Sequence, residues 1–198
     1  MRSLSPRYEA AAAAIDAANA DDPTIIEVRG ERVALALVHG RLATERIEQL
    51  VEEPDETLLL AARAHHLRRW ELPRDGYPLG RAGYLRWRRD QKIRHATDVA
   101  VILASCGYEP AEIEQVQRLI RRESIDGSQD VEDAACLVFI ETQLGSIAAR
   151  MDRGQLVDVI RKTARKMSGR GLEMVARIPL GEQELGLLSE AFSGPEPP

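Results

Sequence analysis

The sequence has few cysteines and no long hydrophobic run. Cys106 and Cys136 stand in apolar surroundings without a CxxC pattern, which argues against a disulfide framework and indicates buried thiols in a reducing compartment. No uncharged apolar stretch reaches the roughly 18 residues that a transmembrane helix needs. Glu9 and Asp16 interrupt the alanine-rich N-terminal segment, so that it does not read as a signal peptide. We therefore expect a cytoplasmic protein with no membrane partner.

Several catalytic signatures are missing as well. The chain has no glycine-rich phosphate loop, no HExxH zinc motif and no nucleophile elbow. Cys106 ends a predicted helix among apolar residues, which is a poor setting for an activated thiolate. These absences argue against nucleotide binding of the P-loop or dinucleotide type, against nucleophilic catalysis and against zincin chemistry.

Positive charge and aromatic side chains are concentrated in one segment. Residues 63–94 contain ten Lys or Arg and three Asp or Glu, although the whole chain has a net charge of −5. Half of the eight aromatic residues fall in the same segment: Trp70, Tyr77, Tyr84 and Trp87. A local basic and aromatic patch on an acidic protein favours a small anionic ligand over extended nucleic acid. The alternative is an arginine-rich helix face that only contacts solvent.

The hydrophobic pattern is helical along nearly the whole chain. It predicts helices over about 6–20, 28–51, 55–70, 80–105, 109–123, 131–151 and 155–167, with shorter helices as far as 192. No strand alternation of useful length, internal repeat or linker is evident. We predict a single all-α helical bundle over 1–192 and a disordered tail over 193–198.

The histidines are spread over three of these predicted helices. His39, the pair His65 and His66, and His95 each lie among apolar residues. A lone buried histidine is usually a core residue, but three helices that each bring an imidazole indicate a metal site, because neutral imidazole is the commonest transition-metal ligand. Asp133 lies on an apolar helix face, where a carboxylate must be paired or bind a metal. It is the candidate fourth ligand, with a structural salt bridge as the alternative.

A stripe of residues three or four apart lies on the predicted helix over 80–105. It is apolar at its C-terminal end and basic and aromatic toward its N-terminus. Arginine forks match phosphate oxygens, and aromatic rings can stack on a base or a sugar. The predicted phosphate- and substrate-binding residues are Arg69, Trp70, Tyr77, Arg81, Tyr84, Trp87, Arg88, Lys162 and Lys166. As alternatives, the tryptophans belong to the core, Arg88 pairs with Glu71 or Asp133, and the two lysines form a solvated face.

Two resemblances bear on these residues. The segment AARAHHLRR, residues 61–69, resembles the central motif of HD-domain metal-dependent phosphohydrolases, with His65 at the family's histidine and His66 at its aspartate. This resemblance implies an HD-like core over about 28–151 that holds one or two metals. The departure at His66 changes the charge next to the metal.

The second resemblance covers nearly the whole chain. The strings AARAHHLRRWELPRDGYPLGRAGYLRWRRDQKIRHA, VEDAACLVFIE and RKTARKMSGRG are similar to the family called domain of unknown function 4202. In that family the position of His66 is the recurring histidine, whereas the position of His65 is often Gln. The two resemblances therefore favour different histidines, and we predict His66 as the metal ligand.

These observations predict a metal-dependent hydrolase of a phosphorylated small molecule or nucleotide. His39, His66, His95 and Asp133 would hold a divalent metal (Mn, Fe, Zn or Mg), and Glu132 or His65 would accept the proton of its bound water. One alternative is a non-catalytic module that binds a nucleotide or RNA on a degenerate HD-like scaffold. Another is a di-iron oxygenase. The sequence leaves the substrate, the metal and the oligomeric state open.

Overall fold

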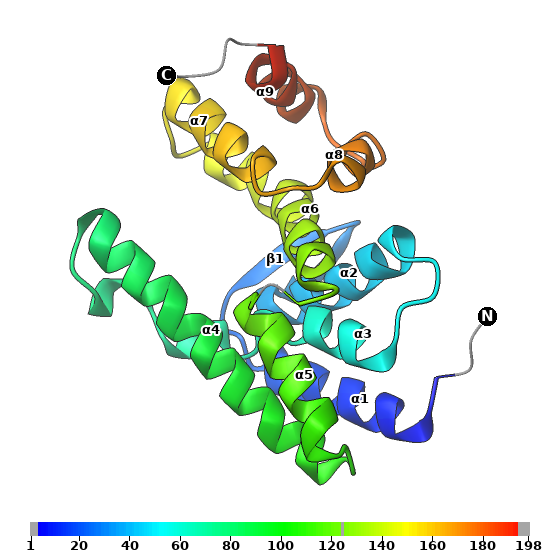
Figure 1. The fold of residues 1–198 in the computed structure, drawn as a ribbon. Helices are drawn as coiled ribbons and strands as arrows, with labels where there is room; N and C mark the ends of the chain where they lie inside the picture. Colours follow the sequence, from blue (N-terminus) through cyan, green and yellow to red (C-terminus); the bar gives the residue numbers. More distant parts are fainter. Residues whose placement is uncertain (1–3, 124, 194–198) are drawn as a thin grey trace.

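The computed structural model describes residues 4–123 and 125–193, which are mostly helical (Figure 1). The first helix, α1 (Pro6–Ala20), has the predicted bounds, because Ser5 caps it by accepting a hydrogen bond from the Tyr8 backbone N–H and Pro6 occupies its first turn. No helix in the described ranges is long and apolar enough to span a bilayer. Of the predicted disordered tail, residues 194–198 lie outside the described residues.

A small antiparallel hairpin stands where a helix was predicted to begin. The strands are β1 (Ile25–Val28) and β2 (Glu31–Ala34), with Ile25 opposite Ala34 and Val28 opposite Glu31. Between them, Arg29 and Gly30 have φ of 53° and 83°, which is the left-handed two-residue turn that matches strand twist. The all-α prediction is wrong over these residues, because the β-branched run and this turn outweigh the helical reading.

The helices that follow form the main body. They are α2 (Leu35–Leu50), α3 (Glu56–Arg63), α4 (Gly80–Ser105), α5 (Pro110–Arg121) and α6 (Ser128–Ala148). Every residue of α3 from Thr57 to Ala62 is buried, because α1, α2, α5 and α6 all pack around it. The long helix α4 packs mainly along α5 (Figure 1). The prediction of a central third helix is confirmed, and the bounds predicted for the fourth are correct.

The third helix ends well before its predicted limit at Trp70. It stops at Arg63, whose guanidinium donates two hydrogen bonds to Asp16 on α1 at 2.8 and 2.7 Å. The chain then turns through Arg68, which has φ of 50° and whose backbone N–H donates to Asn19 Oδ1 at 3.0 Å. A short 3-10 helix, η1 (Arg69–Glu71), follows. The two adjacent histidines therefore lie in a turn and not on a helix face.

The C-terminal helices pack away from α4 and α5. These are α7 (Arg153–Ala164), α8 (Gly169–Val175) and α9 (Glu182–Ser193). They contact α6, and α7 packs against α9. Figure 1 shows α6 running from the main body into this group.

Candidate functional site: a cationic cavity with a histidine cluster

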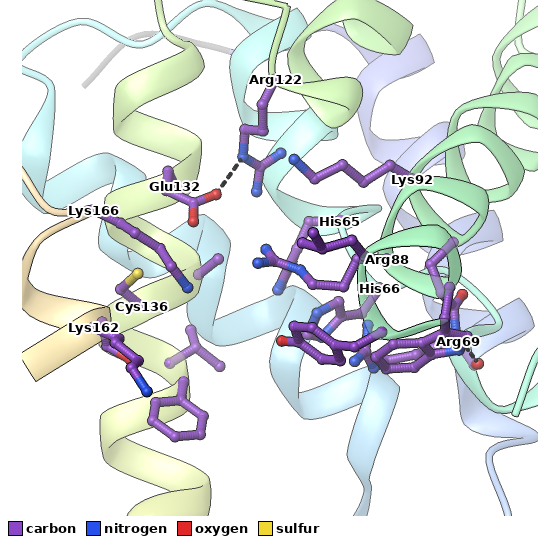
Figure 2. A pocket seen from close by; sticks show the side chains of 18 of the residues that line it. His65, His66, Arg69, Arg88, Lys92, Arg122, Glu132, Cys136, Lys162 and Lys166 are labelled. Carbon is purple, nitrogen blue, oxygen red and sulfur yellow. Dashed lines mark hydrogen bonds and ion pairs between the residues drawn. The ribbon is translucent and has the colours of Figure 1, made fainter. Parts of the chain in front are cut away.

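A cavity of about 1190 Å³ lies between α4 and α7, with the turn after α3 and part of α6 also lining it (Figure 2). All four histidines of the chain line this cavity, and so do all three of its lysines. Its basic residues are Arg69, Arg81, Arg88, Lys92, Arg122, Lys162, Arg165 and Lys166. Glu132 is the one acidic residue of the described chain that lines it. The cavity is therefore strongly positive, although the protein as a whole is acidic.

The imidazole rings gather at one end of the cavity, from three parts of the chain. The rings of His65 and His66 have centroids 4.0 Å apart, and His66 lies 5.3 Å from His39 on α2 and 6.2 Å from His95 on α4. The structure thus brings together the four histidines that the sequence analysis singled out. The early end of α3 makes it possible, because a turn can direct two adjacent side chains to the same space and a helix cannot.

The hydrogen bonds of His39 determine which ring nitrogens carry protons. The Thr142 hydroxyl donates to the Val138 carbonyl at 2.7 Å, so its oxygen accepts from His39 Nε2 at 2.9 Å. His39 Nδ1 then accepts from His66 Nδ1 at 3.0 Å. The Gln143 amide nitrogen lies 3.3 Å from His39 Nε2, and the network is consistent once the amide oxygen and nitrogen are interchanged. This assignment leaves the Nε2 of His66 without a proton.

His65 and His95 carry their proton on Nδ1, as His66 does, but backbone carbonyls hold it there. His65 Nδ1 donates to the Ala62 carbonyl and His95 Nδ1 to the Leu67 carbonyl, each at 2.7 Å. Their Nε2 atoms are buried and have no hydrogen-bond partner in the described structure. Buried polar atoms are nearly always paired, so these two lone pairs mark a place for a hydrogen-bond donor or a metal ion.

All four imidazoles are neutral at pH 7. Burial, followed by the charge of Arg69, lowers the pKa of His39 to about 3. Burial also lowers the pKa of His95 to about 3, against the opposing effect of its bond to the Leu67 carbonyl. The pKa values of His65 and His66 lie well below the ordinary value, mainly because of burial. The rings therefore present lone pairs to the cavity and no positive charge.

Asp133, the predicted fourth metal ligand, does not line the cavity. It is 1% exposed and accepts hydrogen bonds from Gln129 Nε2 (2.9 Å), the Ser168 backbone N–H (2.9 Å) and Ser168 Oγ (2.5 Å). Gly171 approaches so closely that a Cβ there would lie 2.6 Å from the Asp133 carboxyl carbon. Because Ser168 caps α8, the Asp133 carboxylate joins α6 to the start of α8.

The predicted metal set is therefore not assembled. Both ring nitrogens of His39 have hydrogen-bond partners, and Asp133 is held by Ser168. Within 4–123 and 125–193 no group of three or more His, Cys, Asp or Glu side chains is placed to hold a metal ion. The imidazole nitrogens that have no proton or hydrogen-bond partner in the described structure are the Nε2 atoms of His65, His66 and His95.

The basic residues of the cavity have few partners of their own. Arg122 donates to Glu132 at 3.1 Å, but none of the other seven has a carboxylate within 4.0 Å or a side-chain hydrogen bond in the described structure. Arg69 lies over the ring of Trp87 at 4.7 Å, and Arg88 lies 5.9 Å from the ring of Tyr84. Arginines elsewhere are commonly paired, for example Arg63 with Asp16. The cavity thus holds uncompensated positive charge.

The aromatic residues of the basic segment divide into two groups. Tyr84 and Trp87 line the cavity, and the indole N–H of Trp87 also donates to the Leu72 carbonyl at 2.9 Å. Trp70 and Tyr77, which were also predicted to bind substrate, do not line it; Tyr77 Oη donates instead to Asp90 at 3.1 Å. The alternative pairing of Arg88 with Glu71 is not formed, because Glu71 pairs with Arg94 and Arg68.

Three basic residues of the cavity were missed in the sequence: Lys92, Arg122 and Arg165. Lys92 lies one turn after Arg88 on α4, and the scarcity of lysine could have pointed to it, because all three lysines of a chain that otherwise uses arginine meet here. Arg122 reaches the cavity only because it ends α5 in the left-handed conformation, with φ of 61°, and donates to the carbonyls of Leu119 and Ile120. Nothing in the sequence signals that conformation for an arginine.

Glu132 is ionised, because Arg122 and other nearby cations stabilise its carboxylate. Burial alone would raise its pKa, but Arg122, and after it Lys92, Arg88 and Lys166, lower the pKa below the ordinary value. A carboxylate with a lowered pKa is a weak proton acceptor. The role of Glu132 or His65 as the catalytic base stays a prediction.

Burial, together with Arg122, lowers the pKa of Lys92 to about 8. We therefore expect the acetylation rate of Lys92 with acetic anhydride to rise with a midpoint near pH 8. Peptide mass spectrometry across pH 6.5–10 measures this rate, and Lys162 and Lys166 in the same sample serve as internal references. A midpoint above pH 10 for Lys92 would contradict its burial among cations.

The fold and the cavity define a mostly helical protein with a cationic, histidine-bearing pocket. Comparison with protein families then identifies it further: the model described as Domain of unknown function 4202 matches residues 9–188, so the chain belongs to this family. No curated protein and no solved structure matches the chain. The likeness to HD-domain proteins therefore stays a prediction made from one short motif.

Proposed function

We propose that this protein binds a small phosphorylated molecule in the cationic cavity. The observation that carries the proposal is the set of seven basic side chains without a carboxylate partner around one hollow. Gathering like charges in a partly buried site is unfavourable unless an anion neutralises them. Phosphate suits these residues best, because guanidinium groups bind its oxygens in pairs and ammonium groups act as point charges.

The aromatic wall favours a ligand that also carries a ring. Tyr84 and Trp87 have ring centroids 5.9 Å apart, and Arg69 and Arg88 lie over their faces. The Tyr84 ring, which is 43% exposed, can stack on a base or a sugar, whereas Trp87 is only 9% exposed and supports Arg69. The cavity volume of about 1190 Å³ is ample for a nucleotide, since pockets for small ligands are commonly about 300–1,000 Å³.

Arg88→Ala tests the proposal. We expect this variant to bind ADP about tenfold or more weakly than the unchanged protein, because it loses a charge-assisted contact with phosphate. Isothermal titration calorimetry in the presence of a chelator measures the dissociation constant. Arg86→Ala is the matched control, since Arg86 is exposed on the same helix and does not line the cavity. Equal effects of the two variants, or no binding of any phosphate compound, would refute the proposal.

A second candidate is hydrolysis of the bound molecule with a divalent metal. What favours it is the pair of buried Nε2 atoms on His65 and His95, each with its Nδ1 proton fixed by a backbone carbonyl. Histidines that bind metals are usually oriented in this way. A bound metal would supply a water of lowered pKa and polarise a phosphoryl oxygen. Arg69 and Arg88 would stabilise the charge that develops on the phosphoryl group.

Metal analysis of the untreated protein tests this candidate. We expect about one equivalent of Mn, Fe, Zn or Mg, and its loss in His65→Ala and His95→Ala. The expected residues differ from the sequence prediction, because His39→Ala should act only through the orientation of His66. Protein that contains no metal, and whose thermal stability no divalent cation raises, would leave only the binding function.

A further inference from the structure

We propose that the ligand of this cavity carries a diphosphate or a longer phosphate chain, which α4 and α7 bind from opposite sides. This inference rests on the proposed function and specifies its ligand. It concerns four residues, here called the bridging cluster: Arg88 and Lys92 on α4, and Lys162 and Lys166 on α7. All four line the cavity, and none has a carboxylate partner in the described part of the chain.

The two halves of the bridging cluster face each other. Lys162 and Lys166 are four residues apart on α7 and therefore share one face of that helix. Figure 2 shows both pointing into the hollow from one side, while Arg88 and Lys92 enter it from the other. The two helices contact each other little, because α7 is attached to the body through α6. Their like charges repel, so a bound anion between them would join the two walls.

Glu132 does not supply the missing negative charge. It lies within the same group but already accepts a hydrogen bond from Arg122 at 3.1 Å, and these two charges offset each other. The lowered pKa of Lys92 has the same origin, since Arg122, Arg88 and Lys166 all act on it after burial. Four positive charges therefore remain without compensation.

The amount of charge indicates the kind of anion. A single phosphate group bears roughly 1.5 to 2 negative charges near pH 7 and would leave about half of the bridging cluster uncompensated. Each further phosphoryl group adds negative charge and lengthens the anion. A diphosphate would therefore balance most of the four charges.

A second hollow extends the cationic region away from the imidazoles. It has a volume of about 520 Å³ and shares Arg88, Lys92, Arg122, Glu132 and Lys166 with the main cavity. The bridging cluster thus lies between the aromatic and imidazole end and a further open space. A phosphate chain that begins beside Tyr84 has room to continue past Lys166.

The test compares inorganic phosphate with inorganic pyrophosphate. In the presence of a chelator and at constant ionic strength, we expect calorimetry to give roughly thirtyfold tighter binding of pyrophosphate. In the double variant Lys162→Ala/Lys166→Ala this preference should fall to about threefold or less, while the affinity for phosphate changes little. Both lysines are exposed, so folding should be unaffected, and circular dichroism verifies this.

The charge-preserving variant Lys162→Arg/Lys166→Arg is the matched control and should keep most of the preference. The inference is overturned if pyrophosphate and phosphate bind equally well to the unchanged protein. It is also overturned if the alanine variant loses affinity for both anions by the same factor. Either result leaves the proposed function intact, whereas failure of every phosphate compound to bind would remove that function itself.

Discussion

Lowering the pH of chelator-treated protein from 6.5 to 5.0 is expected to remove at least about 3 kcal/mol of its free energy of unfolding. His39 and His95 have folded-state pKa values of about 3, whereas unfolded histidine titrates near 6.5. Between these values the unfolded state binds more protons, so stability falls as the pH falls. An unfolded histidine is half protonated at pH 6.5, so the contribution of each group rises from about 0.7 to about 1.4 kcal/mol per pH unit over this interval. His39 and His95 together account for about 3 kcal/mol, and His65 and His66 act in the same direction.

Urea denaturation followed by circular dichroism at pH 7.5, 6.5, 5.5 and 5.0 measures this loss. The lowered pKa values of carboxylates such as Glu56 and Glu132 place their titration below this window, so the histidines dominate it. His95→Gln provides the control, because it should reduce the dependence on pH by about one proton. Constant stability from pH 7.5 to 5.0 would show that the imidazoles are not buried as described.

Asp133→Ala is expected to lower the free energy of unfolding by about 3 kcal/mol. The substitution leaves the Ser168 backbone N–H and the Ser168 hydroxyl without their acceptor, and each buried donor left unpaired costs about 1–3 kcal/mol. The exposed Gln129 amide loses Asp133 but still donates to the Lys166 carbonyl at 2.8 Å. Water that reaches the exposed edge of the site should bond to some of the freed donors and so reduce this loss of free energy. The remaining cost reflects the weakened attachment of α8 to α6.

The same variant distinguishes a structural carboxylate from a metal ligand. If Asp133 only joins α6 to α8, the loss of stability is equal with and without a chelator. Asp130→Ala, on the same helix, is the control; the Asp130 carboxylate is half-buried, and its pKa is raised by burial and by Asp133, so its removal should cost little. If the loss of stability disappears when a chelator is present, Asp133 is a metal ligand.

The sequence predicts the helices well where local chemistry determines their ends. Ser5 and Pro6 define the start of α1, and Gly107 with φ of 79° follows α4. The hairpin and the end of α3 were missed because local sequence patterns do not indicate either of them. Arg29 adopts a left-handed turn that sequence patterns assign to Asn or Gly. The end of α3 is held by Asp16 and Asn19, which come from a different helix.

The candidate site was predictable to the extent that it depends on composition. Scarce histidines and a cluster of arginines and aromatic rings indicated one pocket, and most of those residues line it. The hydrogen-bond and ion-pair partner of each residue was not predictable, because it depends on packing between helices that are distant in the sequence. Asp133 illustrates this: its burial was correctly inferred, but its partner Ser168 lies 35 residues further along the chain.

The division of the cavity between two parts of the chain has a consequence for how such proteins can diversify. The imidazoles and most of the arginines come from residues before 123, part of α6 also lines the cavity, and the lysines opposite α4 come from α7. Because α7 is attached mainly through α6 and α9, its cavity-facing positions can change without disturbing the imidazoles or their tautomers. Under the proposed function, ligand preference is therefore separable from the histidine cluster, and exchange of one short helix between homologues is expected to alter selectivity.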